Sequence, residues 1–166
     1  MRSVPVAHET PAIDFSDKPR AYRELARQLE GLLSGEQHRI ANAANTVALL
    51  FGALPRINWL GFYFLENGAL VVGPFQGKPA CIRIAIGRGV CGAAAARRET
   101  IVVPDVEAFA DHIVCDSDSR SEIVVPLIEH GKLIGVLDVD SPELARFDDV
   151  DRTGLERLAG IFVASL

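Results

Sequence analysis

Apolar residues recur at helical spacing near both ends of the chain. Asp17-Lys18-Pro19 is typical of a helix start, because proline is tolerated in the first turn, and Gly35 should end that helix. Its apolar face comprises Tyr22, Leu25, Ala26, Leu29, Leu32 and Leu33. A second helix is predicted before Pro55, with one face formed by Ile40, Ala44, Val47, Ala48 and Phe51. The last helix should begin near Asp148, where Asp151 stands at capping-box spacing. Its core-facing residues would be Phe147, Val150, Gly154, Leu158, Ile161 and Phe162.

The middle of the chain has the pattern of β-strands. The predicted strands are Ile57–Leu65, Ala69–Phe75, Ile82–Ile86, Thr100–Val103, Glu122–Ile128 and Lys132–Val139. Asn67-Gly68 is a strong hairpin signal, and Gly131 should form the turn of a second hairpin. Between the hairpins, a glycine-rich turn at Gly87–Gly92 leads into a predicted short helix at Ala93–Arg97.

The order of these elements predicts an α+β fold. Two hairpins imply an antiparallel sheet, and helices at both ends of the chain imply a helical layer packed on one face of it. Residues 1–17 are mixed polar and contain proline, so they should form an N-terminal arm. Residues 18–166 should form a single domain, since the length suits one core.

Composition excludes several classes of protein. The net charge of -5 and the pI of about 5.3 disfavour binding to nucleic acid or to an acidic membrane surface. No apolar run approaches the roughly 18 residues of a membrane helix, and the N-terminus lacks the pattern of a secretory signal. We therefore expect a cytoplasmic protein in a reducing compartment.

The three cysteines are the first candidates for chemistry. Cys81, Cys91 and Cys115 are odd in number, form no Cys-x-x-Cys pair and all fall in loop-like settings. They could be buried small hydrophobic residues, or they could form a redox set with one attacking and one resolving thiol. An attacking thiol needs a lowered pKa, which Arg120, His112 or a helix N-terminus near Cys91 could supply.

Three acidic residues stand on the two strands of the second predicted hairpin. Asp138 and Asp140 are two residues apart and so share one face, and Glu122 opens the partner strand. They could be solvated strand ends. However, Asp138 lies in a very apolar strand, where an acid is costly unless it is paired or used. Clustered carboxyl groups raise one another's pKa, which makes one of them a candidate proton donor.

Trp59 and Tyr63 are the aromatic candidates. They are four apart on a predicted strand, so they share a face, either as ordinary core or as a wall around a small apolar group. Gly87–Gly92 lacks the Lys-Ser/Thr ending of a phosphate-binding loop. The four histidines show no metal-ligand spacing, so no metal site is predicted.

Several motifs together resemble the free methionine-(R)-sulfoxide reductase family, a group of GAF-domain enzymes. The resemblance runs from about residue 18 to the C-terminus and takes in all three cysteines and the acids. Its motifs are residues 58–63 (NWLGFY), 73–81 (GPFQGKPAC), 87–92 (GRGVCG), 112–117 (HIVCDS), 119–126 (SRSEIVVP) and 135–142 (GVLDVDSP). Ala93 and Asp111 stand where the family pattern suggests Thr and Gly.

The resemblance implies a GAF-type domain with a six-stranded antiparallel sheet, usually a homodimer, that reduces free L-methionine (R)-sulfoxide. By matching positions, Cys115 would attack, Cys81 would resolve, and Cys91 would line the pocket. The substrate-binding residues would be Trp59, Tyr63, Glu122, Asp138 and Asp140. No metal or bound cofactor is implied, since thioredoxin, fed by NADPH, would reset the resulting disulfide.

The same residues leave alternatives open. Many GAF domains bind small ligands without catalysis, so a non-catalytic ligand-binding or redox-sensing module is the main alternative. A metal site using the same cysteines is a weaker one.

Overall fold

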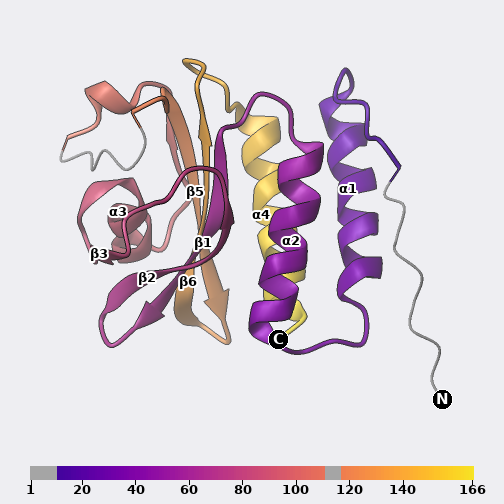
Figure 1. The fold of residues 1–166 in the computed structure, drawn as a ribbon, viewed down its shortest axis with the longest axis horizontal. Helices are drawn as coiled ribbons and strands as arrows, with labels where there is room; N and C mark the ends of the chain where they lie inside the picture. Colours follow the sequence, from indigo (N-terminus) through magenta and orange to yellow (C-terminus); the bar gives the residue numbers. More distant parts are fainter. Residues whose placement is uncertain (1–10, 111–116) are drawn as a thin grey trace.

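The computed structural model describes residues 11–110 and 117–166. A six-stranded antiparallel sheet in the order β3-β2-β1-β6-β5-β4 separates two layers (Figure 1). The helices are α1 (Lys18–Leu33), α2 (Arg39–Ala53), α3 (Gly89–Arg97) and α4 (Asp149–Ala164), and a 3-10 turn spans Val106–Ala108. The strands are β1 (Trp59–Glu66), β2 (Ala69–Gln76), β3 (Arg83–Ala85), β4 (Ile101–Val103), β5 (Ser121–Glu129) and β6 (Lys132–Ser141). The predicted α+β class and antiparallel sheet are confirmed.

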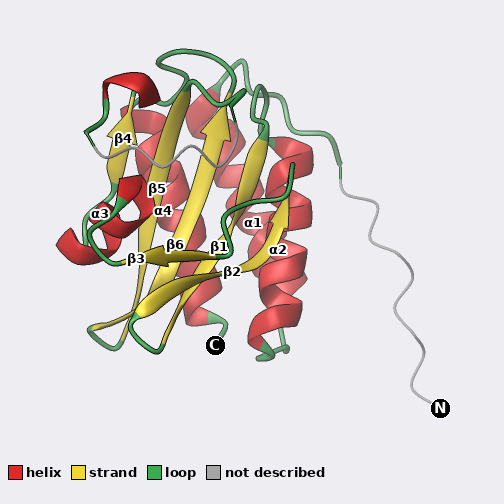
Figure 2. Ribbon diagram, turned by 60° about the vertical axis from the view of Figure 1, so that its left-hand side comes forward, coloured by secondary structure: helices red, strands yellow, loops and turns green. Residues whose placement is uncertain are grey.

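The predicted helical layer is one of two layers. Figures 1 and 2 show α1, α2 and α4 side by side on one face of the sheet, whereas α3 lies on the opposite face. Each face has its own cluster of buried apolar residues. The larger cluster lies under the three long helices, and the smaller one lies under α3. The short helix was predicted, but its position on the second face was not, because the small residues of α3 gave no amphipathic signal.

The structure contains the predicted β1–β2 turn and the predicted helix caps. Asn67 and Gly68 have φ values of 50° and 82°, which suit the tight turn between β1 and β2. Asp17 caps α1 through its side chain, and Asp148 and Asp151 form the expected capping box of α4. The sequence therefore determines these turns and helix starts locally.

The predicted apolar face of α2 is only partly right, since Val47 is buried and Phe51 packs against the larger apolar cluster, but the other three residues are exposed. Ile40 is 46% exposed and Ala44 and Ala48 are exposed, whereas the buried side of the helix includes Asn42 and Thr46. These polar side chains are buried because they are hydrogen-bonded. The Asn42 amide donates to the Glu36 carbonyl and to Ser165 Oγ, and the Thr46 hydroxyl donates to the Asn42 carbonyl. A hydrophobicity pattern cannot identify a face that is anchored by polar pairs.

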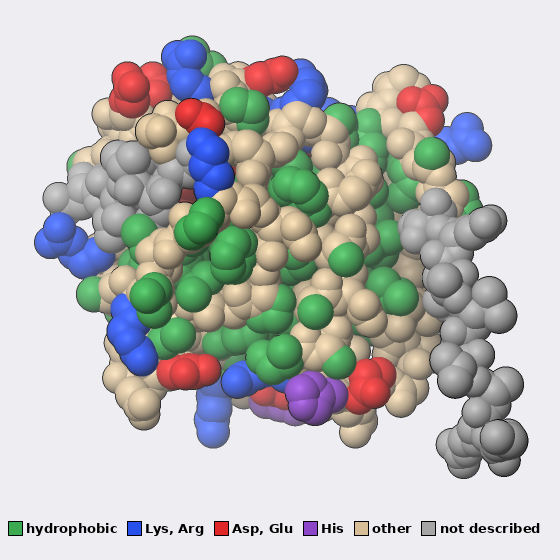
Figure 3. All heavy atoms as spheres, viewed as in Figure 1, with side chains coloured by type: hydrophobic (Ala, Val, Ile, Leu, Met, Phe, Trp, Pro, Cys, Tyr) green, Lys and Arg blue, Asp and Glu red, His purple; other side chains and the backbone are tan. Residues whose placement is uncertain are grey.

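The surface viewed in Figure 3 is mixed in charge. Basic and acidic side chains are interspersed around its edge, and hydrophobic side chains gather toward the region of β2 and β3. On this face, the described residues form no continuous basic patch of the kind that nucleic-acid binding needs. None of the helices in residues 11–110 and 117–166 combines the length and apolar character that crossing a bilayer requires.

A buried ion network fixes the ends of α1 and α4 against the loop before β1. Asp151 accepts hydrogen bonds from Lys18 Nζ (2.6 Å), the Tyr22 hydroxyl (2.9 Å) and Arg146 Nη1 (3.0 Å). Arg146 in turn donates through Nε to the Pro55 carbonyl. The side chains of Asp151 and Arg146 are fully buried, so each charge depends on the other.

We expect Asp151→Ala to destabilise the domain by about 3–5 kcal/mol, because it leaves the buried Arg146 guanidinium without its partner. Urea unfolding followed by circular dichroism measures this loss. Asp149→Ala is the matched control, since Asp149 is exposed in the same helical turn and should cost less than about 1 kcal/mol. Equal losses in the two variants would contradict the role given to the network.

Candidate active site

Strand register gathers the predicted acidic and aromatic residues on the face covered by α3. Glu122 of β5 pairs with Asp140 of β6, and Asp140 also pairs with Trp59 of β1. Directly opposed residues, and residues two apart on one strand, point to the same face. Asp138 and Tyr63 therefore join this face. Five residues that are up to 81 positions apart in the chain (140 − 59) thus line one side of the sheet.

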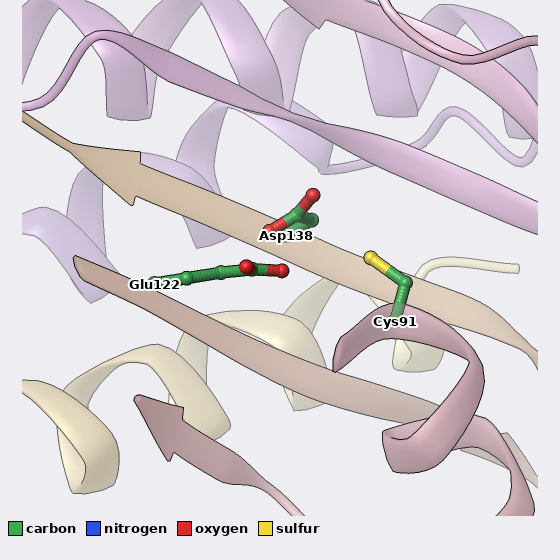
Figure 4. A group of neighbouring side chains, drawn as sticks. All are labelled: Cys91, Glu122 and Asp138. Carbon is green, nitrogen blue, oxygen red and sulfur yellow. The ribbon is translucent and has the colours of Figure 1, made fainter. Parts of the chain in front are cut away.

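The centre of this face is a cluster of one thiol and two carboxyl groups. Cys91 Sγ and one carboxyl oxygen each from Glu122 and Asp138 lie within 4.8 Å of one another. Figure 4 shows the three functional groups pointing toward one another from α3, β5 and β6. All three residues are buried, with exposures of 3%, 6% and 7%. Within the part of the chain that the structure describes, these are also the side chains that could hold a metal ion.

The glycine-rich segment brings Cys91 to this position. Gly87 and Gly89 have φ values of 86° and 59°, which favour glycine, and the Gly87 amide donates to the Gly92 carbonyl at 2.8 Å. A Cβ at Gly92 would overlap the Ala85 carbonyl oxygen. The predicted tight turn with close backbone approach is therefore present. The helix begins at Gly89 rather than Ala93, so Cys91 lies within its first turn.

Burial raises the pKa of both carboxyl groups. Burial, reinforced by Asp138 and Asp140, raises the pKa of Glu122 well above its ordinary value of 4.5. Burial also raises the pKa of Asp138, but hydrogen bonds from Cys91 and Glu122 hold that rise back. The proton therefore lies preferentially on Glu122, and Asp138 acts as the hydrogen-bond acceptor. Of the two groups, Glu122 is therefore the candidate proton donor.

Cys91 is a free thiol with a raised pKa. Burial, followed by the charges of Asp138 and Glu122, raises the pKa of Cys91 well above its ordinary value. The expectation that a helix N-terminus would lower it is not met. A helix terminus contributes about 0.3–1 kcal/mol, which desolvation and two nearby acids outweigh. Cys91 is therefore a hydrogen-bond donor and not a ready nucleophile.

Trp59 forms a fixed aromatic wall on the same face. Its ring stacks on Tyr63 at 5.9 Å and on Phe75 at 5.3 Å between ring centroids. Its indole N–H donates to the Lys78 carbonyl at 3.1 Å. A Cβ at Gly61 would lie 2.6 Å from Trp59 Cη2, so the indole lies along the strand only because position 61 has no side chain. Tyr63 is buried, and this burial raises its pKa.

Of the two remaining candidate cysteines, one lies within the described residues and one lies outside them. Cys81 is half-buried, packs against the smaller apolar cluster and is disulfide-bonded. Cys115 and His112 lie outside the described residues. Arg120 is exposed. Lys78, three residues before Cys81, forms an ion pair with Asp118.

Sequence reasoning missed the residues that position the others. Gly61 and Gly77 both lie against the Trp59 ring, and Gly92 allows α3 to approach β3. The signal for Gly61 was present, since a glycine interrupts an aromatic-rich strand, and such glycines often mark close approach. The Lys78–Asp118 pair joins segments 40 residues apart and had no local signal.

Burial of Glu122 predicts a pH dependence of stability. The folded chain retains a proton that the unfolded chain releases above about pH 4.5. The stabilisation that comes from this retained proton is thus complete below that pH. It is lost as the pH rises toward the raised pKa of Glu122 in the folded protein. Between about pH 5 and pH 7, wild type should lose up to about 1.4 kcal/mol per pH unit relative to Glu122→Gln.

Urea unfolding at a series of pH values, under reducing conditions, measures this difference. Glu129→Gln is the control, because Glu129 lies on the same strand but is not fully buried. Parallel stability curves for wild type and Glu122→Gln would show that Glu122 is charged in the folded protein.

Trp59 is the only tryptophan of the chain, so its fluorescence reports on this site. We expect Gly61→Ala to displace the indole and to change its emission maximum, whereas Gly160→Ala, where a Cβ has open space, should not. Unchanged emission from Gly61→Ala would contradict the role assigned to Gly61.

Comparisons with known proteins agree with this arrangement. A family model described as the GAF domain matches residues 32–166. The free methionine-R-sulfoxide reductase of Escherichia coli (strain K12) is 51% identical over 142 residues, which span 86% of each chain. The X-ray structure of free methionine-R-sulfoxide reductase from Neisseria meningitidis in complex with its substrate has a TM-score of 0.91 and 48% identity, covering 95% of each chain.

A third similar protein, a solved structure, is named as a sensor and not as a reductase. A structure from Burkholderia vietnamiensis, described as a GAF sensor protein, is 59% identical with a TM-score of 0.86, covering 89% of this chain and 94% of that one. Identity at this level over most of both chains establishes common ancestry in each case. The chain therefore belongs to the GAF-domain family and, within it, to the free methionine-R-sulfoxide reductases.

Proposed function

We propose that this protein reduces free L-methionine (R)-sulfoxide to methionine. The observation that carries the proposal is a pair of carboxyl groups, Glu122 and Asp138, that lie buried beside a thiol and an aromatic wall and whose pKa values that burial raises. A sulfoxide oxygen leaves poorly unless it is protonated, so this reaction needs an acid that remains neutral near pH 7. The reductase names of close relatives support the same reaction.

Glu122 is the proton donor in this proposal. Its carboxyl group donates a proton to the sulfoxide oxygen, with Asp140, its direct cross-strand neighbour, as a second contact. Asp138, which accepts hydrogen bonds, is the group placed to receive the ammonium of the substrate. Satisfying the charged amino group within the site favours a free amino acid over a peptide, which lacks that charge.

The aromatic residues hold the other end of the substrate. Trp59 and Tyr63 are both buried and present ring surface beside the carboxyl cluster. Sulfur and methyl groups pack favourably on aromatic rings, with gains of about 0.3–1.5 kcal/mol. The thioether end of methionine therefore fits this wall, and in this proposal the sulfoxide oxygen points toward Glu122.

Cys115 is the nucleophile of the proposed cycle. Its thiolate attacks the sulfur of the protonated sulfoxide and forms an S–S bond. The hydroxyl then passes from the substrate sulfur to Cys115 as that S–S bond breaks, so neutral methionine departs and Cys115 is left as a sulfenic acid. Cys81 then attacks the sulfenic acid, which releases water and forms a disulfide. Thioredoxin supplies two electrons by dithiol exchange and is itself reduced at the expense of NADPH. No bound cofactor or metal takes part.

Two observations support the pairing of Cys81 with Cys115. The Lys78–Asp118 ion pair joins residues that lie three positions from each of these cysteines in the sequence. Cys81 is also engaged in a disulfide, while Cys91 is a free thiol. Cys91 therefore serves as a wall of the pocket and as a hydrogen-bond donor to Asp138. We further propose that the protein acts as a homodimer in the cytoplasm.

Turnover tests this proposal directly. With thioredoxin, thioredoxin reductase and NADPH, wild type should consume NADPH with free methionine (R)-sulfoxide but not with the (S) epimer or a peptide-bound residue. Cys115→Ser should abolish turnover. Glu122→Gln should lower kcat by about 10²–10⁴-fold, the usual contribution of a general acid, whereas Glu129→Gln should not. Full activity of Glu122→Gln would overturn the proposed proton donor.

A second candidate is a sensor that binds a small ligand without turnover, which the name of the Burkholderia relative favours. The same assay separates the two functions. A sensor would quench or enhance Trp59 fluorescence on ligand addition while consuming no NADPH.

A further inference from the structure

We propose that Cys91, Glu122 and Asp138 bind a thiophilic divalent cation, Zn²⁺ foremost, which blocks the substrate site reversibly. The binding site stands on the geometry of these three side chains alone, whereas the inhibitory effect rests on the proposed reductase function. No metal takes part in the proposed reaction, so the ion acts as an inhibitor and not as a cofactor.

The ligand atoms are already close to a metal-binding arrangement. Cys91 Sγ and the two carboxyl oxygens lie within 4.8 Å of one another. Around a tetrahedral zinc ion with ordinary bond lengths, such atoms would be about 3.5 Å apart. Contraction by about 1 Å is within the reach of side-chain rotation alone, because Figure 4 shows the groups already converging. Three protein ligands leave a fourth position for water.

The ligands come from rigid elements. Glu122 and Asp138 stand on the adjacent strands β5 and β6, and Cys91 stands in the first turn of α3. The close backbone contact at Gly92 holds that turn against the end of β3. Binding therefore requires little ordering of the chain, which lowers its entropic cost.

A second observation points to a cation at the same place. Asp138 Oδ1 is buried with no hydrogen-bond partner among the described residues. An unsatisfied buried acceptor costs about 1–3 kcal/mol, and either a substrate ammonium or a metal ion would satisfy it. The two occupants would therefore compete, because both require the same carboxyl group.

The donor set selects among metals. A cysteine sulfur favours Zn²⁺ and similar soft or borderline ions, whereas Mg²⁺ and Ca²⁺ prefer sites made only of oxygen. When Zn²⁺ binds, it displaces the Cys91 thiol proton and forms a Zn–S bond, and the proton leaves to solvent. No oxidation or reduction takes place, so a chelator should reverse the effect.

Binding is measured first, without reference to catalysis. The protein is reduced with a phosphine, stripped of metal and titrated with Co²⁺, then with Zn²⁺ as competitor. We expect a thiolate-to-cobalt charge-transfer band that Zn²⁺ removes at one equivalent. The double variant Cys81→Ser/Cys115→Ser should keep the band, because it retains Cys91 as the only thiol.

Cys91→Ala should abolish the band. Asp138→Asn should weaken Zn²⁺ affinity by more than the roughly 10–100-fold that loss of an outer-shell partner costs. Glu129→Gln, on the same strand as Glu122, should leave the affinity unchanged. A band that persists in Cys91→Ala, or the absence of any band in wild type and in the double variant, would overturn the proposal.

Activity is the second measurement. Zn²⁺ should raise the KM for methionine sulfoxide in wild type without changing kcat, and a chelator should restore it. Mixed or kcat-only inhibition would show that the ion acts elsewhere and would overturn the inhibitory role. If wild type binds Co²⁺ through Cys91 but shows no turnover with any sulfoxide, the metal site stands and the proposed function fails.

Discussion

The constraint on which this structure depends is the burial of two carboxyl groups and a thiol against one another. Glu122, Asp138 and Cys91 cannot all be charged in a site from which water is largely excluded, so protons must remain. The pairing of β5 with β6 fixes the two acids, and the turn at Gly92 brings the thiol to them. Any change of register by one residue would move the acids to the opposite face.

The opposite face of the sheet stabilises the domain that carries this cluster. Three long helices pack there over the larger apolar core, and the buried Asp151–Arg146 network fixes α4. Among the described residues, the site face is covered by the short α3 and by the 3-10 turn Val106–Ala108. This division explains how the domain tolerates an unsatisfied acceptor at Asp138, because its stability comes mainly from side chains that play no part in the chemistry.

Features encoded by neighbouring residues were predictable from the sequence, and features encoded by tertiary contact were not. The Asp148–Asp151 capping box and the Asn67-Gly68 turn are local, and the two-residue spacing of Asp138 and Asp140 places them on one face. The buried face of α2 was mispredicted in part, because Asn42 is anchored by partners in the α1–α2 loop and at the C-terminus. The approach of Cys91 to Asp138 depends on α3, which has no amphipathic pattern.

The same orphaned oxygen of Asp138 links the proposed substrate and the proposed inhibitor. A proton, an ammonium and a divalent cation each satisfy it, and they differ in charge and in what they demand of Cys91. A proton or an ammonium leaves the thiol intact, whereas Zn²⁺ requires the thiolate. Cys91 therefore has a physical role even without attacking the substrate, because the same thiol donates a hydrogen bond to Asp138 and would supply the sulfur ligand of a bound ion. The proposed substrate and the proposed inhibitor thus require different states of one side chain.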